Sequence, residues 1–191
     1  LAGLINRGTC GELASTVPCI SPVAWTSLMT GKNPEKHGIY DFLVRQPNSY
    51  SMRCNSSVSR RSKAVWNLLT EAGRTVGVVD LILTYPPEEV NGFILSGLGS
   101  PDRNTPFTYP PQLGKDILKN VGSYVSAVPF IECLLEAKDE DGAMERFVAA
   151  IFAEIENREQ IASYLMQRYP SDFFGVVFQT TDLASHYCWK Y

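Results

Sequence analysis

The chain has 191 residues, of which 45 % are hydrophobic and 19 % are charged. This length and composition are typical of one globular domain with a sizeable core, and they exclude a chain that is disordered throughout. The net charge of −3 argues against a nucleic-acid polymer or an anionic membrane surface as the partner, because neither would attract a negative chain.

The first third of the chain predicts short elements joined by polar segments. The opening residues, 1–13, resemble the tail of a helix, and residues 12–17 (ELASTV) indicate a short strand. Residues 32–38 contain Asn, Pro and Gly and therefore predict a turn. The stretch 44–62 is rich in Ser and Arg, so we expect a surface loop there.

A short helix is expected between these segments. Ser21 is a suitable N-cap, Pro22 suits the first helical turn, and Gly31 suits the helix C-terminus. These signals predict a helix over 22–30.

The middle of the chain predicts a helix followed by two strands. Residues 63–72 have an apolar face and end before Gly73, and that face consists of Val65, Leu68, Leu69 and Ala72. Residues 75–81 and 92–96 are apolar runs that favour buried strands. This order indicates an α/β fold with a mainly parallel sheet.

Residues 83–114 contain two Tyr-Pro-Pro triplets and are either an inserted cap or an ordinary long connection. Apolar residues at spacings of three or four predict a long helix over 143–168, and Pro170 ends it. Residues 172–179 then indicate another buried strand.

The two ends of the sequence and its cysteines indicate how complete the domain is and which compartment it occupies. The chain begins with Leu1 and stops at Tyr191 without a closing element, so we expect 1–191 to be one truncated catalytic domain. An odd number of cysteines with no Cys-x-x-Cys pair favours free thiols in a reducing, cytoplasmic compartment. No apolar run reaches the roughly 18 residues of a membrane span.

Ser21 is the first candidate for chemistry. The positive end of a helix dipole binds phosphate and stabilises an alkoxide, and a nearby divalent cation would lower the pKa of the hydroxyl further. Since Pro22 has no N–H, the backbone groups that donate hydrogen bonds to a phosphate would come from later in the first turn. The alternative is that Ser21 only caps the helix.

Asp182 and His186 form the second candidate. They follow a buried strand, and four-residue spacing puts both side chains on one face of a helix. A carboxylate and an imidazole are suitable ligands for Zn²⁺ or Mn²⁺. The alternative is a helix-start aspartate with a neighbouring histidine.

Three other side chains could contribute to a site or to the fold. For two of them, both interpretations stay open, and the third is expected to be structural. His37 is either a metal ligand or supporting group, or a turn residue that braces its loop. Asp80 ends a strand and either points into a site or caps the next turn. Asp41 is expected to be structural.

Taken together and in this order, these segments resemble the alkaline phosphatase superfamily. "SPVAWTSLMTGKNPEKHGIYDF" is similar to the nucleophile segment of the type I phosphodiesterase and nucleotide pyrophosphatase branch, which includes predicted phosphohydrolases and phosphomutases. Thr30-Gly31, Pro34 and His37-Gly38-Ile39 match its "TG-x-x-P-x-x-HGI" pattern. "TDLASHYCW" resembles the family's Asp-x-x-x-His metal motif.

The resemblance implies part of a three-layer α/β/α sandwich and hydrolysis of a phosphodiester, a nucleotide pyrophosphate or a phosphomonoester. It assigns Ser21, ten residues before Gly31, as the nucleophile and a metal-bridging ligand. Asp182 and His186 would bind one of two divalent ions, with zinc expected and manganese as the alternative. The substrate would be a small phosphorylated molecule such as a nucleotide.

The chain also departs from the family pattern. It has only two histidines, which cannot complete the usual two-metal shell, and Ala24 stands where one branch has an oxyanion-binding Asn. Either flanking sequence supplies the missing ligands, or the chain is a truncated, inactive copy. A phosphomutase of the same superfamily and a non-catalytic binding module with this fold are the alternative functions.

Overall fold

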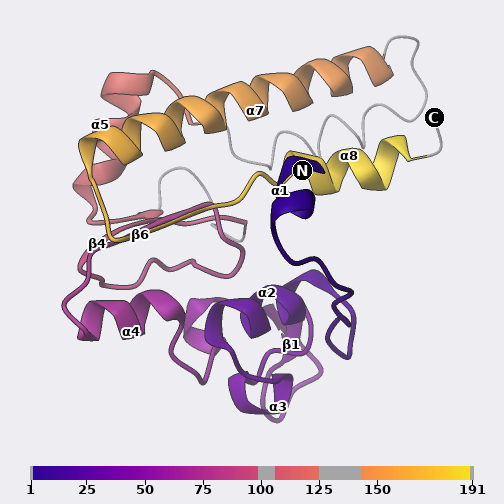
Figure 1. Cartoon of the computed structure of the whole chain (residues 1–191). Coiled ribbons are helices and arrows are strands. Elements are labelled where there is room, and N and C mark those ends of the chain that lie inside the picture. The colour runs from indigo at the N-terminus through magenta and orange to yellow at the C-terminus, as the bar shows by residue number, and fades with distance from the viewer. Residues whose placement is uncertain (1, 99–105, 125–142, 190–191) are drawn as a thin grey trace.

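The computed structural model describes residues 2–98, 106–124 and 143–189 (Figure 1). In chain order its elements are α1 (Ala2–Arg7), α2 (Ser21–Thr30), α3 (Pro34–His37), β1 (Leu43–Arg45), β2 (Met52–Cys54), the 3₁₀ turn η1 (Ser57–Ser59), α4 (Val65–Glu71), β3 (Val76–Val79), β4 (Gly92–Leu95), β5 (Thr108–Tyr109), α5 (Gln112–Val121), α7 (Ala143–Arg168), β6 (Phe173–Val176) and α8 (Thr180–Cys188).

The main sheet has four strands in the order β5-β4-β3-β6. β3 runs parallel to both β4 and β6, while β5 is antiparallel to β4. Each parallel strand has four residues, and Val78 in the centre pairs with Ile94 on one side and Gly175 on the other. The expected α/β fold with a mainly parallel sheet is therefore confirmed.

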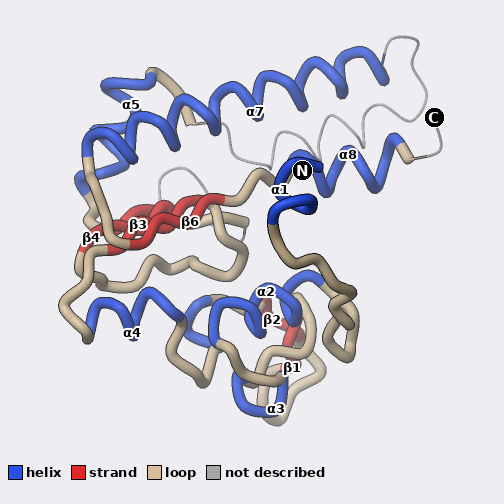
Figure 2. The backbone as a smooth tube through the Cα atoms, viewed as in Figure 1, coloured by secondary structure: helices blue, strands red, loops and turns tan. Residues whose placement is uncertain are grey.

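Helices cover both faces of this sheet (Figures 1 and 2). Successive strand residues point to opposite faces, so each strand supplies both core layers. On the α4 side, Val76, Val78 and Ile94 pack with Trp66 and Met29. On the other side, the apolar cluster combines strand residues with residues of α5 and α7, namely Val79, Phe93, Leu95, Leu113, Ile117, Ile161 and Leu165.

Helix α7 is the longest element, and its predicted bounds of 143–168 are confirmed. Its inward stripe contains Phe147, Ile151 and Leu165, which are 1 %, 7 % and 0 % exposed. The carboxyl-terminal part packs on the sheet and α5, while Phe147 and Ile151 pack against α8. None of the described helices is long and apolar enough to cross a membrane.

Three local predictions were wrong. Residues 12–17 form no strand, and Leu13 and Val17 remain almost fully exposed because no described strand pairs with them. The expected loop at 44–62 contains the antiparallel β1–β2 hairpin, held by backbone pairing rather than by an apolar pattern. In α4, Trp66 packs in the buried cluster and its indole donates to the Glu88 carboxylate at 2.9 Å, whereas Leu68 faces outward and is exposed.

The segment 83–114 contributes β4 and β5 to the sheet, and α5 begins near its end. The helix α5 was not predicted, since its polar residues hide its short apolar stripe. Residues 99–105 lie outside the described part, so the choice between a cap and an ordinary connection stays a prediction.

Gly92 should be essential to the start of β4. Its φ is 140°, and a Cβ there would lie 2.0 Å from the Val76 carbonyl oxygen. We expect Gly92→Ala to lower the free energy of unfolding by about 3 kcal/mol or more, measured by urea denaturation. Gly73→Ala is the matched control, because its φ is 73° and no atom lies within 4 Å of the added Cβ. It should cost about 1 kcal/mol. Equal losses in the two variants would contradict the clash at Gly92.

Candidate active site

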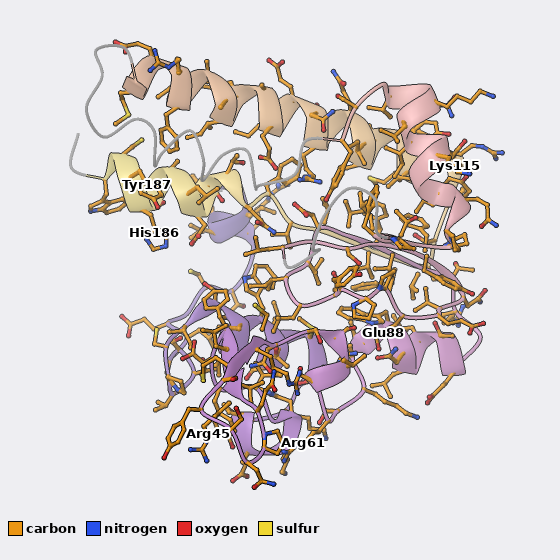
Figure 3. All side chains as sticks on the ribbon, turned by 180° about the vertical axis from the view of Figure 1, so that it is seen from behind. Arg45, Arg61, Glu88, Lys115, His186 and Tyr187 are labelled. Carbon is orange, nitrogen blue, oxygen red and sulfur yellow. The ribbon has the colours of Figure 1, made fainter. Side chains whose placement is uncertain are left out.

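The candidate site lies at the carboxyl edge of the parallel strands. Asp80 directly follows β3, and β6 leads into α8, which carries Asp182 and His186. In open α/β sheets, ligands bind beyond the carboxyl ends of the strands. In Figures 1 and 3 the chain descends from α1 to α2.

Ser21 is the first residue of α2, not its N-cap. The N-cap is Ile20, and no side chain caps this helix. Ser21 is exposed, and within the described residues its hydroxyl forms no hydrogen bond. The expected capping role is therefore wrong, and the hydroxyl is not committed to holding the helix end.

The amide groups after Ser21 are already occupied. The N–H groups of Val23 and Ala24 both donate to the Ile20 carbonyl, at 3.1 and 3.0 Å, and Pro22 has none. The expectation of anion donors from later in the first turn is thus not met. The helix end still carries a partial positive charge, but a substrate anion needs a stronger cation as well.

Asp182 and His186 lie one turn apart on α8, as predicted. Their Oδ2 and Nε2 atoms are 3.6 Å apart, and the side chains are 66 % and 68 % exposed. Figure 3 shows His186 extending away from α8. Across 2–98, 106–124 and 143–189, no group of three or more His, Cys, Asp or Glu residues is placed to hold a metal ion. These residues thus fit two positions of a metal shell and not a complete one.

His37 braces its loop. The side chain is fully buried, and its Nδ1 accepts the Ile39 N–H at 3.1 Å. An accepting Nδ1 leaves the ring proton of the neutral tautomer on Nε2, which lies 3.0 Å from the Ser27 hydroxyl and donates to it. Burial lowers the pKa of His37 and so favours this neutral form. With both nitrogens engaged, the structure supports bracing over metal binding.

Asp80 faces α7. Its carboxylate lies 2.8 Å from the Arg158 guanidinium, which is also 2.9 Å from Glu154. All three side chains are at least nine-tenths buried. The Asp80 carbonyl oxygen accepts a hydrogen bond from the Gln179 amide at 3.3 Å, just before α8. Asp80 therefore joins β3 to α7 and to the start of α8, rather than lining an open site.

This ion cluster carries two carboxylates and one guanidinium. One positive charge cannot balance two buried negative charges, and burial raises the pKa of Asp80 to about 7. Sequence reasoning missed Glu154 and Arg158. The available signal was their position, since charged residues within the apolar stripe of an amphipathic helix need buried partners.

The remaining candidates are structural. Asp41 is exposed, and its carboxylate accepts the Phe42 N–H at 2.6 Å, as expected of a local support. Of the neighbouring basic residues Arg60, Arg61 and Lys63, Arg60 pairs with Glu88 at 2.7 Å and Lys63 pairs with Glu71.

The carboxyl edge of a mainly parallel sheet is where open α/β proteins generally bind their ligands. The chain belongs to the type I phosphodiesterase / nucleotide pyrophosphatase family, whose profile matches residues 1–190. Membership implies phosphoester hydrolysis. Comparison with curated proteins and with solved structures gave no significant match.

The ion cluster predicts a pH dependence of stability. The folded-state pKa of Asp80, about 7, exceeds its ordinary value of 3.8, so the folded chain retains a proton that the unfolded chain releases. The resulting stabilisation is complete below about 3.8 and is lost as the pH rises through about 7. Asp80→Asn should flatten this part of the curve, measured by urea denaturation at a series of pH values. Asn also tolerates the φ of 62° found at this position.

Asp172→Asn is the control for this experiment. Hydrogen bonds from Thr75 lower the pKa of Asp172, so its contribution is lost only as the pH falls. The slope below neutral pH should survive in that variant. An unchanged slope in Asp80→Asn would contradict the assignment of the proton to Asp80.

Proposed function

We propose that the chain cleaves a phosphodiester, a nucleotide pyrophosphate or a phosphomonoester through a covalent intermediate on Ser21. The observation that carries the proposal is the uncommitted Ser21 hydroxyl at the start of α2. It stands ten residues before Gly31, which ends the helix with a φ of 63°. The family match over residues 1–190 supplies the class of reaction.

In the proposed reaction, Ser21 Oγ attacks phosphorus in line with the leaving oxygen. The Oγ–P bond forms while the bond from phosphorus to the leaving oxygen breaks, and the serine proton goes to solvent. The leaving oxygen takes up a proton from solvent. Water then attacks phosphorus, the Oγ–P bond breaks, Ser21 Oγ regains a proton and the phosphate product leaves. The α2 terminus contributes a positive potential at Ser21, but the occupied amides of Val23 and Ala24 contribute no direct donors.

Two divalent ions are part of the proposal, with zinc preferred and manganese as the alternative. When bound, such ions lower the pKa of the serine hydroxyl and balance charge on the phosphate oxygens. We assign Asp182 and His186 as ligands of one ion, on the grounds of their 3.6 Å separation and their exposure on α8. Among the described residues, no third His, Cys, Asp or Glu is grouped with this pair.

The proposed substrate is a small phosphorylated molecule. The chain's net charge of −3 argues against a polyanion such as a nucleic acid, and Arg60 and Lys63 are each paired with a carboxylate. A compact phosphate group needs only a local cation and a nucleophile.

Ser21→Ala should lower the rate of nitrophenolate release from bis(4-nitrophenyl) phosphate, with Zn²⁺ or Mn²⁺ added, by about 10³-fold or more. Ser27→Ala is the matched control on the same helix. It removes the hydrogen bond to His37 and should reduce stability by about 1 kcal/mol while keeping most of the activity. If Ser21→Ala turns over near the wild-type rate, the nucleophile is another group.

Asp182→Asn combined with His186→Gln should weaken Zn²⁺ binding at least about tenfold in a calorimetric titration. The double variant loses the negatively charged oxygen of Asp182 and the imidazole of His186, which lie close together on α8. Asp172→Asn, an exposed carboxylate paired with Arg74, is the control and should leave the titration unchanged. Equal affinity in the double variant and the wild type would remove these residues from the metal site.

A further inference from the structure

A cavity lies at the edge of the sheet opposite the candidate active site. Its volume is about 580 Å³, within the range of small-molecule pockets. Its wall includes Val76 and Gly92, the first residues of β3 and β4, and Ser171, which precedes β6. All three parallel strands therefore begin at this cavity, whereas Asp80 and α8 lie where strands end.

The floor of the cavity is apolar. Phe93 and Leu113 are at most 3 % exposed, and Pro110 and Tyr169 extend the same surface. Phe93 and Tyr169 pack with their ring centroids 5.8 Å apart. This surface suits a flat or compact hydrocarbon group and offers few partners for a sugar or a peptide backbone.

The rim is cationic. Lys115 and Lys119 lie one turn apart on α5 and both line the cavity. Both are exposed, and neither forms an ion pair in the part of the chain that the structure describes. Figure 3 shows Lys115 on α5, at the end of the molecule away from His186. Two ammonium groups at the mouth of an apolar cavity complement an anionic head group.

Asp116, the carboxylate in the cavity wall, is already satisfied. Its Oδ2 accepts hydrogen bonds from the hydroxyls of Tyr164 and Tyr169, at 2.7 and 2.8 Å, and its Oδ1 accepts one from Asn120 at 3.0 Å. These hydrogen bonds hold Asp116 and Tyr169 together in the wall.

We propose that this cavity binds a small amphipathic anion, an aromatic or alicyclic body that carries one carboxylate, sulfonate or phosphate. The body lies on the floor formed by Phe93 and Leu113, and the acidic group lies between Lys115 and Lys119. The site is separate from Ser21 and α8, so it does not depend on the proposed hydrolysis.

The test uses two fluorescent probes in parallel, 8-anilinonaphthalene-1-sulfonate and the uncharged N-phenyl-1-naphthylamine. In the variant with both Lys115→Glu and Lys119→Glu, the dissociation constant of the sulfonate should rise about tenfold or more. That of the uncharged probe should change less than about twofold. The matched control, Lys32→Glu with Lys36→Glu, carries the same charge change on the α2–α3 segment and should leave both constants unchanged.

Amide hydrogen exchange places the probe. Saturation with the sulfonate should protect the amides of residues 112–121 and those of Tyr169 and Ser171. An unchanged sulfonate affinity in the Lys115 and Lys119 variant would overturn the proposal. Protection confined to residues 180–188 would also overturn it. So would protection of the cavity residues that increases with protein concentration in the absence of probe, because a second copy of the chain would then occupy the cavity.

Discussion

The ion cluster of Asp80, Glu154 and Arg158 is the constraint on which the arrangement around the sheet depends. The Arg158 side chain is 1 % exposed, so removing its partners leaves a charge buried without compensation. Arg158 sits between the two apolar parts of α7, one packed on the sheet and one packed on α8. The cluster therefore holds α7 in place across β3. The position of α8 is set in turn by its packing against α7 and by the Gln179–Asp80 hydrogen bond.

Elements with a strong periodic signal could be predicted from the sequence. The 143–168 helix has apolar residues at helical spacing and a proline beyond its end, and β3 and β4 are unbroken apolar runs. The failures had physical causes. Residues 12–17 resemble a strand but have no described partner, and the β1–β2 hairpin depends on pairing between polar segments. Whether a segment finds a pairing partner depends on distant residues, so it cannot be predicted from a short stretch of sequence.

The features of the candidate site likewise divide into those that could be predicted from the sequence and those that could not. Four-residue spacing sufficed to predict that Asp182 and His186 share a helical face, because that is a local property of α8. The partners of Asp80 lie far along the chain, and nothing near Asp80 in sequence indicates them. The tautomer of His37 likewise depends on the Ile39 amide and the Ser27 hydroxyl, so its bracing role required coordinates.

The parallel strands are only four residues long. At about 3.3 Å per residue, such a strand spans roughly 13 Å. The edge where the strands begin and the edge where they end are thus separated by little more than the thickness of a helix with its side chains. A sheet this shallow has almost no interior along the strand direction, so a rigid-body displacement of β3 by one residue would remodel both edges at once.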